Sequence, residues 1–213
     1  MSDLPLAHQF ETAEQQREAA NLGMWTFLTT EVLFFGGLFL AYAVYRLKYP
    51  EAFGEASNHL YIWLGAFNTA VLLGSSWTMA RAVYAGEQGD RRRTLSFLVA
   101  TTGLGLVFLA VKAVEYGLDY HDGLIPGPDF RRQWSVERTH AQLYFVLYFV
   151  MTGLHAAHML AGVGVMLAVG ALVWRGPSPA RYANTLEMAG LYWHFVDIVW
   201  IFLFPLLYLI AWP

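Results

Sequence analysis

Cysteine is absent from all 213 residues. Its absence excludes disulfide bonds, thiolate nucleophiles, iron–sulfur clusters and the C-x-x-C-H attachment of c-type haem. A thiolate-bridged copper centre is excluded for the same reason. Any redox centre held by this chain would have to use other ligands, of which histidine is the candidate.

Charge is also scarce, at 14% of residues, whereas an ordinary soluble domain has roughly a quarter. Hydrophobic residues make up 57% of the chain and aromatic residues 16%. The net charge is −3, and no basic run is longer than the three arginines at 91–93, so nucleic acid is not an expected partner. The composition is typical of a membrane protein.

No alternation of period two recurs in ten-residue blocks, which a lipid-embedded barrel would require. Backbone groups in hydrocarbon must then be satisfied within helices of about twenty residues. We expect an all-α, polytopic membrane bundle in residues 21–213, preceded by a polar segment at residues 1–20. About five transmembrane helices are predicted, near 22–46, 60–85, 95–118, 140–174 and 184–212.

The polar segment at residues 1–20 carries four acids and one arginine, which is unlike a secretory leader, so no cleaved signal is expected. A cytoplasmic N-terminus would place seven basic residues inside and five outside, which favours that orientation. The seven are Arg17, Arg81, Arg91, Arg92, Arg93, Arg175 and Arg181.

Ionisable residues within the predicted spans need partners, because a charge at the centre of a membrane helix costs about 2.5–3.5 kcal/mol on insertion scales. Glu187, Gly190, His194 and Asp197 recur at spacings of three, four and three. They form one stripe of a helix. We expect this stripe to face protein.

The preceding span is predicted to pack on both sides. His155 and His158 share one face with Gly162. A small-residue face lies roughly opposite. It consists of Gly153, Ala157, Ala161 and Gly164.

Two carboxylates stand out elsewhere. Glu31 lies about 14 Å into the first span with no basic residue near it in sequence. We expect it to be protonated and to donate a hydrogen bond. Lys112 and Glu115 are a turn apart near a predicted helix end and are interpreted as an interfacial ion pair whose lysine extends toward water.

The residues alone leave three roles open for His155, His158 and His194. Intramembrane histidines form hydrogen bonds between helices, ligate haem or a metal, or relay protons. An i, i+3 pair such as His155 and His158 fits a metal only if other helices supply further ligands.

Several stretches resemble the subunit III family of the haem-copper oxidases (cytochrome c oxidase subunit 3), in order and over residues 20–212. "TTEVLFFGGLFLAYAVYR" resembles the family's glutamate-bearing helix, and "FNTAVLLGSS" its Asn-Thr helix. "GLVFLAVKAVEY", "TGLHAAHMLAGVG" and "LEMAGLYWHFVDIVWIFLF" are similar to the three helices that follow. The glutamate-bearing helix is the third of seven in the long form, so this chain resembles the short, five-helix form.

The resemblance implies roles for particular residues. Glu31 matches the carbodiimide-reactive carboxyl of the family, a buried group that could modulate proton uptake. Five residues match recurrent buried polar positions that contact other helices or lipid headgroups, and none is a catalytic residue or a metal ligand. They are His155, His158, Glu187, His194 and Asp197.

The expected function is therefore that of a non-catalytic subunit III of a haem-copper terminal oxidase, most simply a cytochrome c oxidase, in a bacterial inner membrane. The chain would bind phospholipids and pack on subunit I, with subunit II and smaller subunits as further partners. Haem and copper would lie in subunit I, which needs at least six intramembrane histidines, whereas this chain offers three.

Two alternatives stay open. The nearer is an accessory subunit of a nitric oxide reductase. The farther is a b-type cytochrome anchor that uses His158 and His194 as axial haem ligands.

Overall fold

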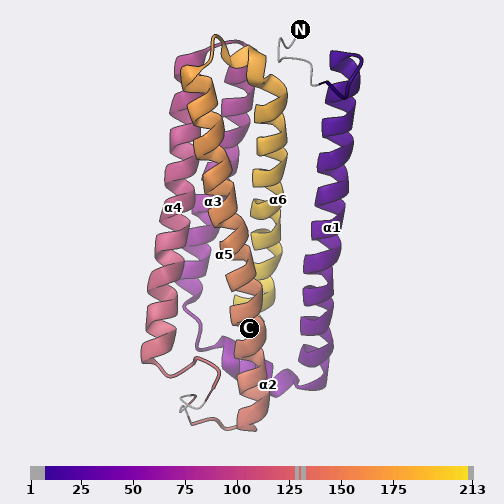
Figure 1. The fold of residues 1–213 in the computed structure, drawn as a ribbon. Coiled ribbons are helices and arrows are strands. Elements are labelled where there is room, and N and C mark those ends of the chain that lie inside the picture. Colours follow the sequence, from indigo (N-terminus) through magenta and orange to yellow (C-terminus); the bar gives the residue numbers. More distant parts are fainter. Residues whose placement is uncertain (1–7, 128–129, 131–132, 211–213) are drawn as a thin grey trace.

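The computed structural model describes residues 8–127, 130 and 133–210, and within these residues it contains helices and no strands (Figure 1). The all-α prediction is confirmed. The helices are α1 (Ala13–Lys48), α2 (Pro50–Ser57), α3 (Ile62–Glu87), α4 (Arg91–His121), α5 (Arg138–Arg175), the 3₁₀ helix η1 (Pro179–Tyr182) and α6 (Ala183–Tyr208).

Four stretches of the described residues are long and apolar enough to cross a membrane: α1, α4, α5 and the continuous Pro179–Tyr208. The fifth predicted span, α3, has 26 residues, which is about 39 Å of helix and long enough to cross. Its apolar character is diluted by Asn68, Ser75 and Ser76. Because α3 packs against α4 and α6, these polar side chains meet protein instead of lipid.

Helix α1 begins at Ala13, nine residues before the predicted start, so part of the polar segment is helical. Thr12 caps the helix, since its side-chain oxygen accepts a hydrogen bond from the Gln15 amide at 3.1 Å. A helix can extend beyond its apolar part into water, which hydropathy alone does not reveal. Helix α2 was not predicted, because its eight residues are too few to span a membrane.

Helices α3 to α6 form a bundle, and α1 stands beside α6 at the edge of it (Figure 1). Helix α2 turns the chain from α1 into the bundle at one end. There, the rings of Tyr42, Phe53 and Tyr144 join α1, α2 and α5, with centroids 5.4–6.4 Å apart. The Tyr42 and Tyr144 hydroxyls donate to the carbonyls of Leu206 and Leu207, which satisfies the end of α6.

Two buried tryptophans of α6 form the centre of the bundle. Trp193 and Trp200 are each 0% exposed. Their indole N–H groups donate to Ser75 and Thr69 of α3, at 3.1 and 3.0 Å. The hydroxyl-bearing residues that make α3 less apolar are therefore the partners that these indoles need.

Within this chain, α5 is packed on one of the two faces for which packing was predicted. His155 and Gly162 are buried, but Ala157, Ala161 and Gly164 of the opposite face are exposed. Among the described residues, this small-residue face is therefore left largely uncovered, and its packing on a partner stays a prediction.

Candidate functional site: a groove between α1 and α6

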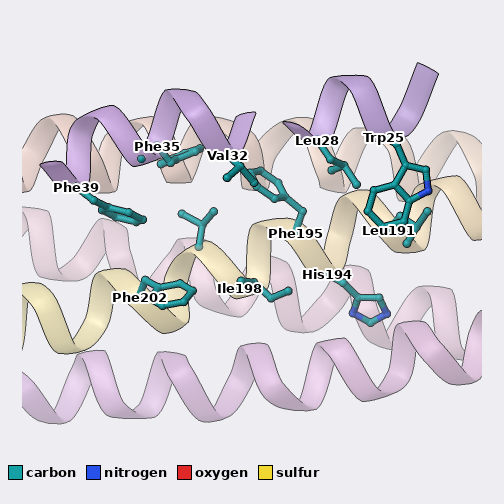
Figure 2. A pocket seen from close by; sticks show the side chains of 12 residues that line it. Trp25, Leu28, Val32, Phe35, Phe39, Leu191, His194, Phe195, Ile198 and Phe202 are labelled. Atoms are coloured by element: carbon teal, nitrogen blue, oxygen red, sulfur yellow. The ribbon is translucent and has the colours of Figure 1, made fainter. Parts of the chain in front are cut away.

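An apolar groove of about 470 Å³ separates α1 from α6. Figure 2 shows side chains from both helices lying along it, with Trp25 and His194 toward one end and Phe39 and Phe202 toward the other. Across the groove the Phe35 and Phe195 rings are 6.2 Å apart. Its lining is Trp25, Leu28, Val32, Phe35, Gly36, Phe39, Leu191, His194, Phe195, Ile198, Val199 and Phe202.

Glu31 of α1 is hydrogen-bonded to a histidine of α5. Glu31 Oε2 lies 3.1 Å from His158 Nε2, and the two side chains are 19% and 20% exposed. His158 Nδ1 lies 2.8 Å from the carbonyl oxygen of Leu154. A carbonyl only accepts, so Nδ1 must carry hydrogen, and the proton between Glu31 and Nε2 is the one that the pair can exchange.

This geometry allows two states with the same proton count. Either a protonated Glu31 donates to a neutral His158, or an imidazolium donates to the Glu31 carboxylate. The expected protonated Glu31 thus has an acceptor, although the sequence could not place it, because His158 lies 127 residues away.

His194 and Asp197 of α6 turn toward α3. His194 Nδ1 is 2.7 Å from the Ser76 hydroxyl, so this histidine makes a bond between helices. Asp197 is 3% exposed and also faces Ser76, yet neither of its carboxylate oxygens has a hydrogen bond within the described residues. Ser76 was not among the predicted site residues, and its serine-rich neighbourhood at 75–76 was the available signal.

His155 lies deeper in the bundle. It is 1% exposed, and its ring packs near Trp200 at 5.3 Å and Phe108 at 5.4 Å between centroids. Neither ring nitrogen has a hydrogen-bond partner within the described residues. The structure therefore does not unite His155 with His158, since the two rings contact different neighbours.

Glu187 departs from the predicted protein-facing stripe. Gly190 and Asp197 are buried and His194 is half-buried, whereas Glu187 is exposed. Glu187 lies in the second turn of α6, near the end of the bundle, where a carboxylate can stay hydrated without a protein partner.

The interpretation of Lys112 and Glu115 as an interfacial pair is wrong. The lysine is 3% and the glutamate 0% exposed, and their ion pair is 3.0 Å long. The pair is near the end of α4, which continues to His121, but α5 and α6 enclose it, since Lys112 donates to Tyr148 and Tyr208 of those helices. Sequence reasoning also missed Asp119, which shares their face at spacings of three and four.

The histidines do not fit an axial haem pair. The His158 ring is engaged by α1 and the His194 ring by α3, so each imidazole is directed to a different helix. No group of three or more metal-ligating side chains comes together in the part of the chain that the structure describes. The arrangement joins helices and offers an apolar groove.

The sequence of this chain matches a known protein family. The sequence pattern of "Cytochrome c oxidase subunit III" matches residues 7–122 and 132–212, nearly the whole chain. The chain belongs to the cytochrome c oxidase subunit III family. It is therefore a membrane protein and a subunit III of a haem-copper oxidase.

Its relatives in this family serve more than one kind of oxidase. The chain is 32% identical over 192 residues to "Cytochrome c oxidase subunit 3" of Synechocystis, covering 88% of this chain and 74% of the relative. It is 31% identical to the protein of the same name from Corynebacterium diphtheriae, covering 94% and 96%. A "Probable quinol oxidase subunit 3" of Staphylococcus saprophyticus is 30% identical, covering 97% and 98%.

Proposed function

We propose that this chain is a non-catalytic subunit III that binds phospholipid in the groove between α1 and α6, packs on subunit I, and supports proton uptake and the durability of the complex. The groove is the observation that carries the proposal. Its apolar lining and length along two spanning helices suit an acyl chain, which would be held by burial of apolar surface.

The Glu31–His158 pair supports the part of the proposal that concerns protons. One exchangeable proton sits between the two side chains, between α1 and α5. The two side chains are 19% and 20% exposed in the isolated chain, so a proton can reach them from outside the bundle. The pair would therefore modulate proton uptake without any redox centre in this chain, haem and copper being held by subunit I.

We also propose a bacterial inner membrane with the N-terminus in the cytoplasm. The relatives from Synechocystis, Corynebacterium and Staphylococcus are bacterial. At the proposed cytoplasmic end, Arg91 donates to the carbonyls of Gly176 and Pro177 and so fixes the loop between α5 and η1. Arg92 and Arg93 are exposed at the same end and suit the positive-inside rule.

Two adjacent glycines of α1 provide a matched test. Gly36 lines the groove and Gly37 does not, and a Cβ at either position would meet nothing within 4 Å. We expect Gly36→Leu to fill the groove and lower the phospholipid retained by the purified complex, as counted by lipid mass spectrometry. Gly37→Leu adds the same side chain to the same helix and should leave lipid retention unchanged.

Equal lipid content in the two variants would contradict the assignment of lipid to this groove. Absorption spectra of subunit I should stay unchanged in both, because the substitutions lie in a chain proposed to have no redox centre.

A further inference from the structure

A buried charged cluster joins α4, α5 and α6, away from the groove. It contains Lys112, Glu115 and Asp119 of α4, Tyr148 of α5 and Tyr208 of α6. Each of these residues is at most 3% exposed. A lysine and two carboxylates enclosed by protein on all sides raise the question of how many charges the cluster carries.

Lys112 is surrounded as a cation would be. Its Nζ lies 5.0 Å from the ring centroids of Tyr116 and Tyr148 and 5.5 Å from that of Trp200. Aromatic faces attract an ammonium group and do not attract a neutral amine in the same way. Glu115 is the carboxylate that pairs with this ammonium, at 3.0 Å, so Lys112 and Glu115 cancel each other's charge.

The hydrogens in the cluster can be counted. Lys112 has three, and it donates them to Glu115 Oε2, to the Tyr148 hydroxyl at 3.1 Å and to the Tyr208 hydroxyl at 2.9 Å. Tyr208 donates its single hydrogen to Glu115 Oε1. Tyr148 also has one hydrogen, but its oxygen lies near two carboxylates, 3.0 Å from Glu115 Oε1 and 3.2 Å from Asp119 Oδ2.

An ionised Asp119 would have too few hydrogen-bond donors at this position. Its Oδ1 has no partner within the described residues, and Tyr148 could reach Oδ2 only by giving up Glu115. The other groups that face it are unfavourable or occupied. Glu115 and Asp122 are acidic, Lys112 is paired with Glu115 and donates its three hydrogens elsewhere, and the Tyr144 hydroxyl donates to the Leu207 carbonyl. The cluster would then carry an uncompensated negative charge, which is costly in a buried site.

We propose that Asp119 holds a bound proton in the native complex and donates it from Oδ2 to the Tyr148 hydroxyl, which leaves the cluster neutral. Tyr148 then accepts from Asp119 and Lys112 and donates to Glu115, so each hydroxyl hydrogen has one acceptor. Glu115 stays ionised and receives three hydrogen bonds. The cluster is thus a proton-binding site and a neutral link between three helices.

Two substitutions of equal size distinguish the carboxyl that holds the proton. Asp119→Asn imitates a protonated aspartate, so the complex should assemble normally with an unchanged thermal midpoint. Glu115→Gln leaves the Lys112 ammonium without its counter-charge, so assembled complex should be lost. Adding Lys112→Met to Glu115→Gln removes both charges and should restore assembly at least in part.

Infrared difference spectroscopy on the assembled complex reports the proton itself. Subtracting the Asp119→Asn spectrum from that of the wild type should reveal a carboxylic-acid C=O stretching band that Asp119→Asn lacks. Failure of Asp119→Asn to assemble, or absence of that band from the difference spectrum, would overturn the proposal. A band that disappears with Glu115→Gln and persists with Asp119→Asn would place the proton on the other carboxyl and would also overturn it.

Discussion

Single hydrogen bonds determine what the intramembrane side chains can do. The Leu154 carbonyl fixes hydrogen on Nδ1 of His158, so Nε2 is left to share a proton with Glu31. The Ser76 hydroxyl of α3 is hydrogen-bonded to His194 of α6, across a different pair of helices. Because each imidazole is hydrogen-bonded to a neighbouring helix, the geometry indicates that these histidines connect helices.

Substitution of Glu31 separates the hydrogen bond from the titratable proton. In Glu31→Gln the amide can still donate to Nε2, so thermal stability of the complex should be close to that of the wild type. Glu31→Ala leaves a partly buried imidazole nitrogen unpaired, which should cost about 1 kcal/mol. Thermal midpoints and the number of turnovers before inactivation measure the two effects.

Both Glu31 variants should keep the absorption spectrum of subunit I. Gly37→Ala is the control on the same helix, because a Cβ there meets nothing within 4 Å. Loss of a haem signal in Glu31→Gln would count against a connecting role for this residue.

The contact between Glu55 and Ser135 depends on pH. Glu55 of α2 accepts from the Ser135 amide at 3.0 Å and from the Ser135 hydroxyl, and these bonds lower the pKa of Glu55 from its usual 4.5. A lowered carboxyl pKa means that the contact stabilises the loop above pH 4.5, and that this contribution is lost as pH falls through the lowered value.

Ser135→Ala should therefore raise the pKa of Glu55 toward its ordinary value. We expect amide exchange protection at position 135 to be lost at a higher pH than in the wild type. Ser96→Ala is the control, because its hydroxyl bonds the Arg92 carbonyl of its own helix. Identical pH profiles for Ser135→Ala and the wild type would show that the hydroxyl does not set this pKa.

At the scale of helices, close packing depends on glycines that face Trp193. A Cβ at Gly105 of α4 would lie 2.6 Å from the Trp193 ring, and one at Gly162 of α5 would lie 3.0 Å from it. The indole occupies the space that the missing side chains leave. Three helices therefore meet around one aromatic ring.

Gly105→Ala should displace that ring and destabilise the bundle by about 1–3 kcal/mol. Gly103→Ala, on the same helix, meets nothing within 4 Å and should be neutral or slightly stabilising, since alanine favours helix. The thermal midpoints of the two purified complexes test the difference. Equal midpoints would contradict the packing of Trp193 described above.

Sequence reasoning predicted the long helices of this chain but not its short elements. Apolar run length predicted α1, α3, α4, α5 and α6, because a bilayer fixes the length of a spanning helix. It did not reveal α2, which is eight residues long, nor the polar first turns of α1. Pattern alone could not say that Lys112 is enclosed, since that depends on Tyr148 and Tyr208 of other helices.

Of the residues that line the groove, only His194 was singled out from the sequence. Motif resemblance selected Glu31, His158 and His194, but their hydrogen-bond partners lie on other helices, 127 residues away for Glu31 and His158 and 118 for Ser76 and His194. Only the folded chain brings such residues together. The groove likewise required both α1 and α6 to be placed.

At the scale of the whole molecule, α1 stands at the edge of the bundle (Figure 1). The apolar groove lies between α1 and α6. Large apolar side chains also face outward from α1, including Leu22, Leu33 and Leu47 at 71–83% exposure. The chain therefore presents apolar surface on the outside, as a membrane subunit does. Several of its buried polar side chains form hydrogen bonds between its own helices.

The most direct test of a subunit III role without redox centres is native mass spectrometry of the purified complex combined with metal analysis of the separated chain. We expect the chain to accompany the haem-bearing subunit I of an oxidase, to retain phospholipid, and to carry no iron or copper once separated. Iron or copper that stays with this chain, or a nitric oxide reductase as its partner, would contradict the account.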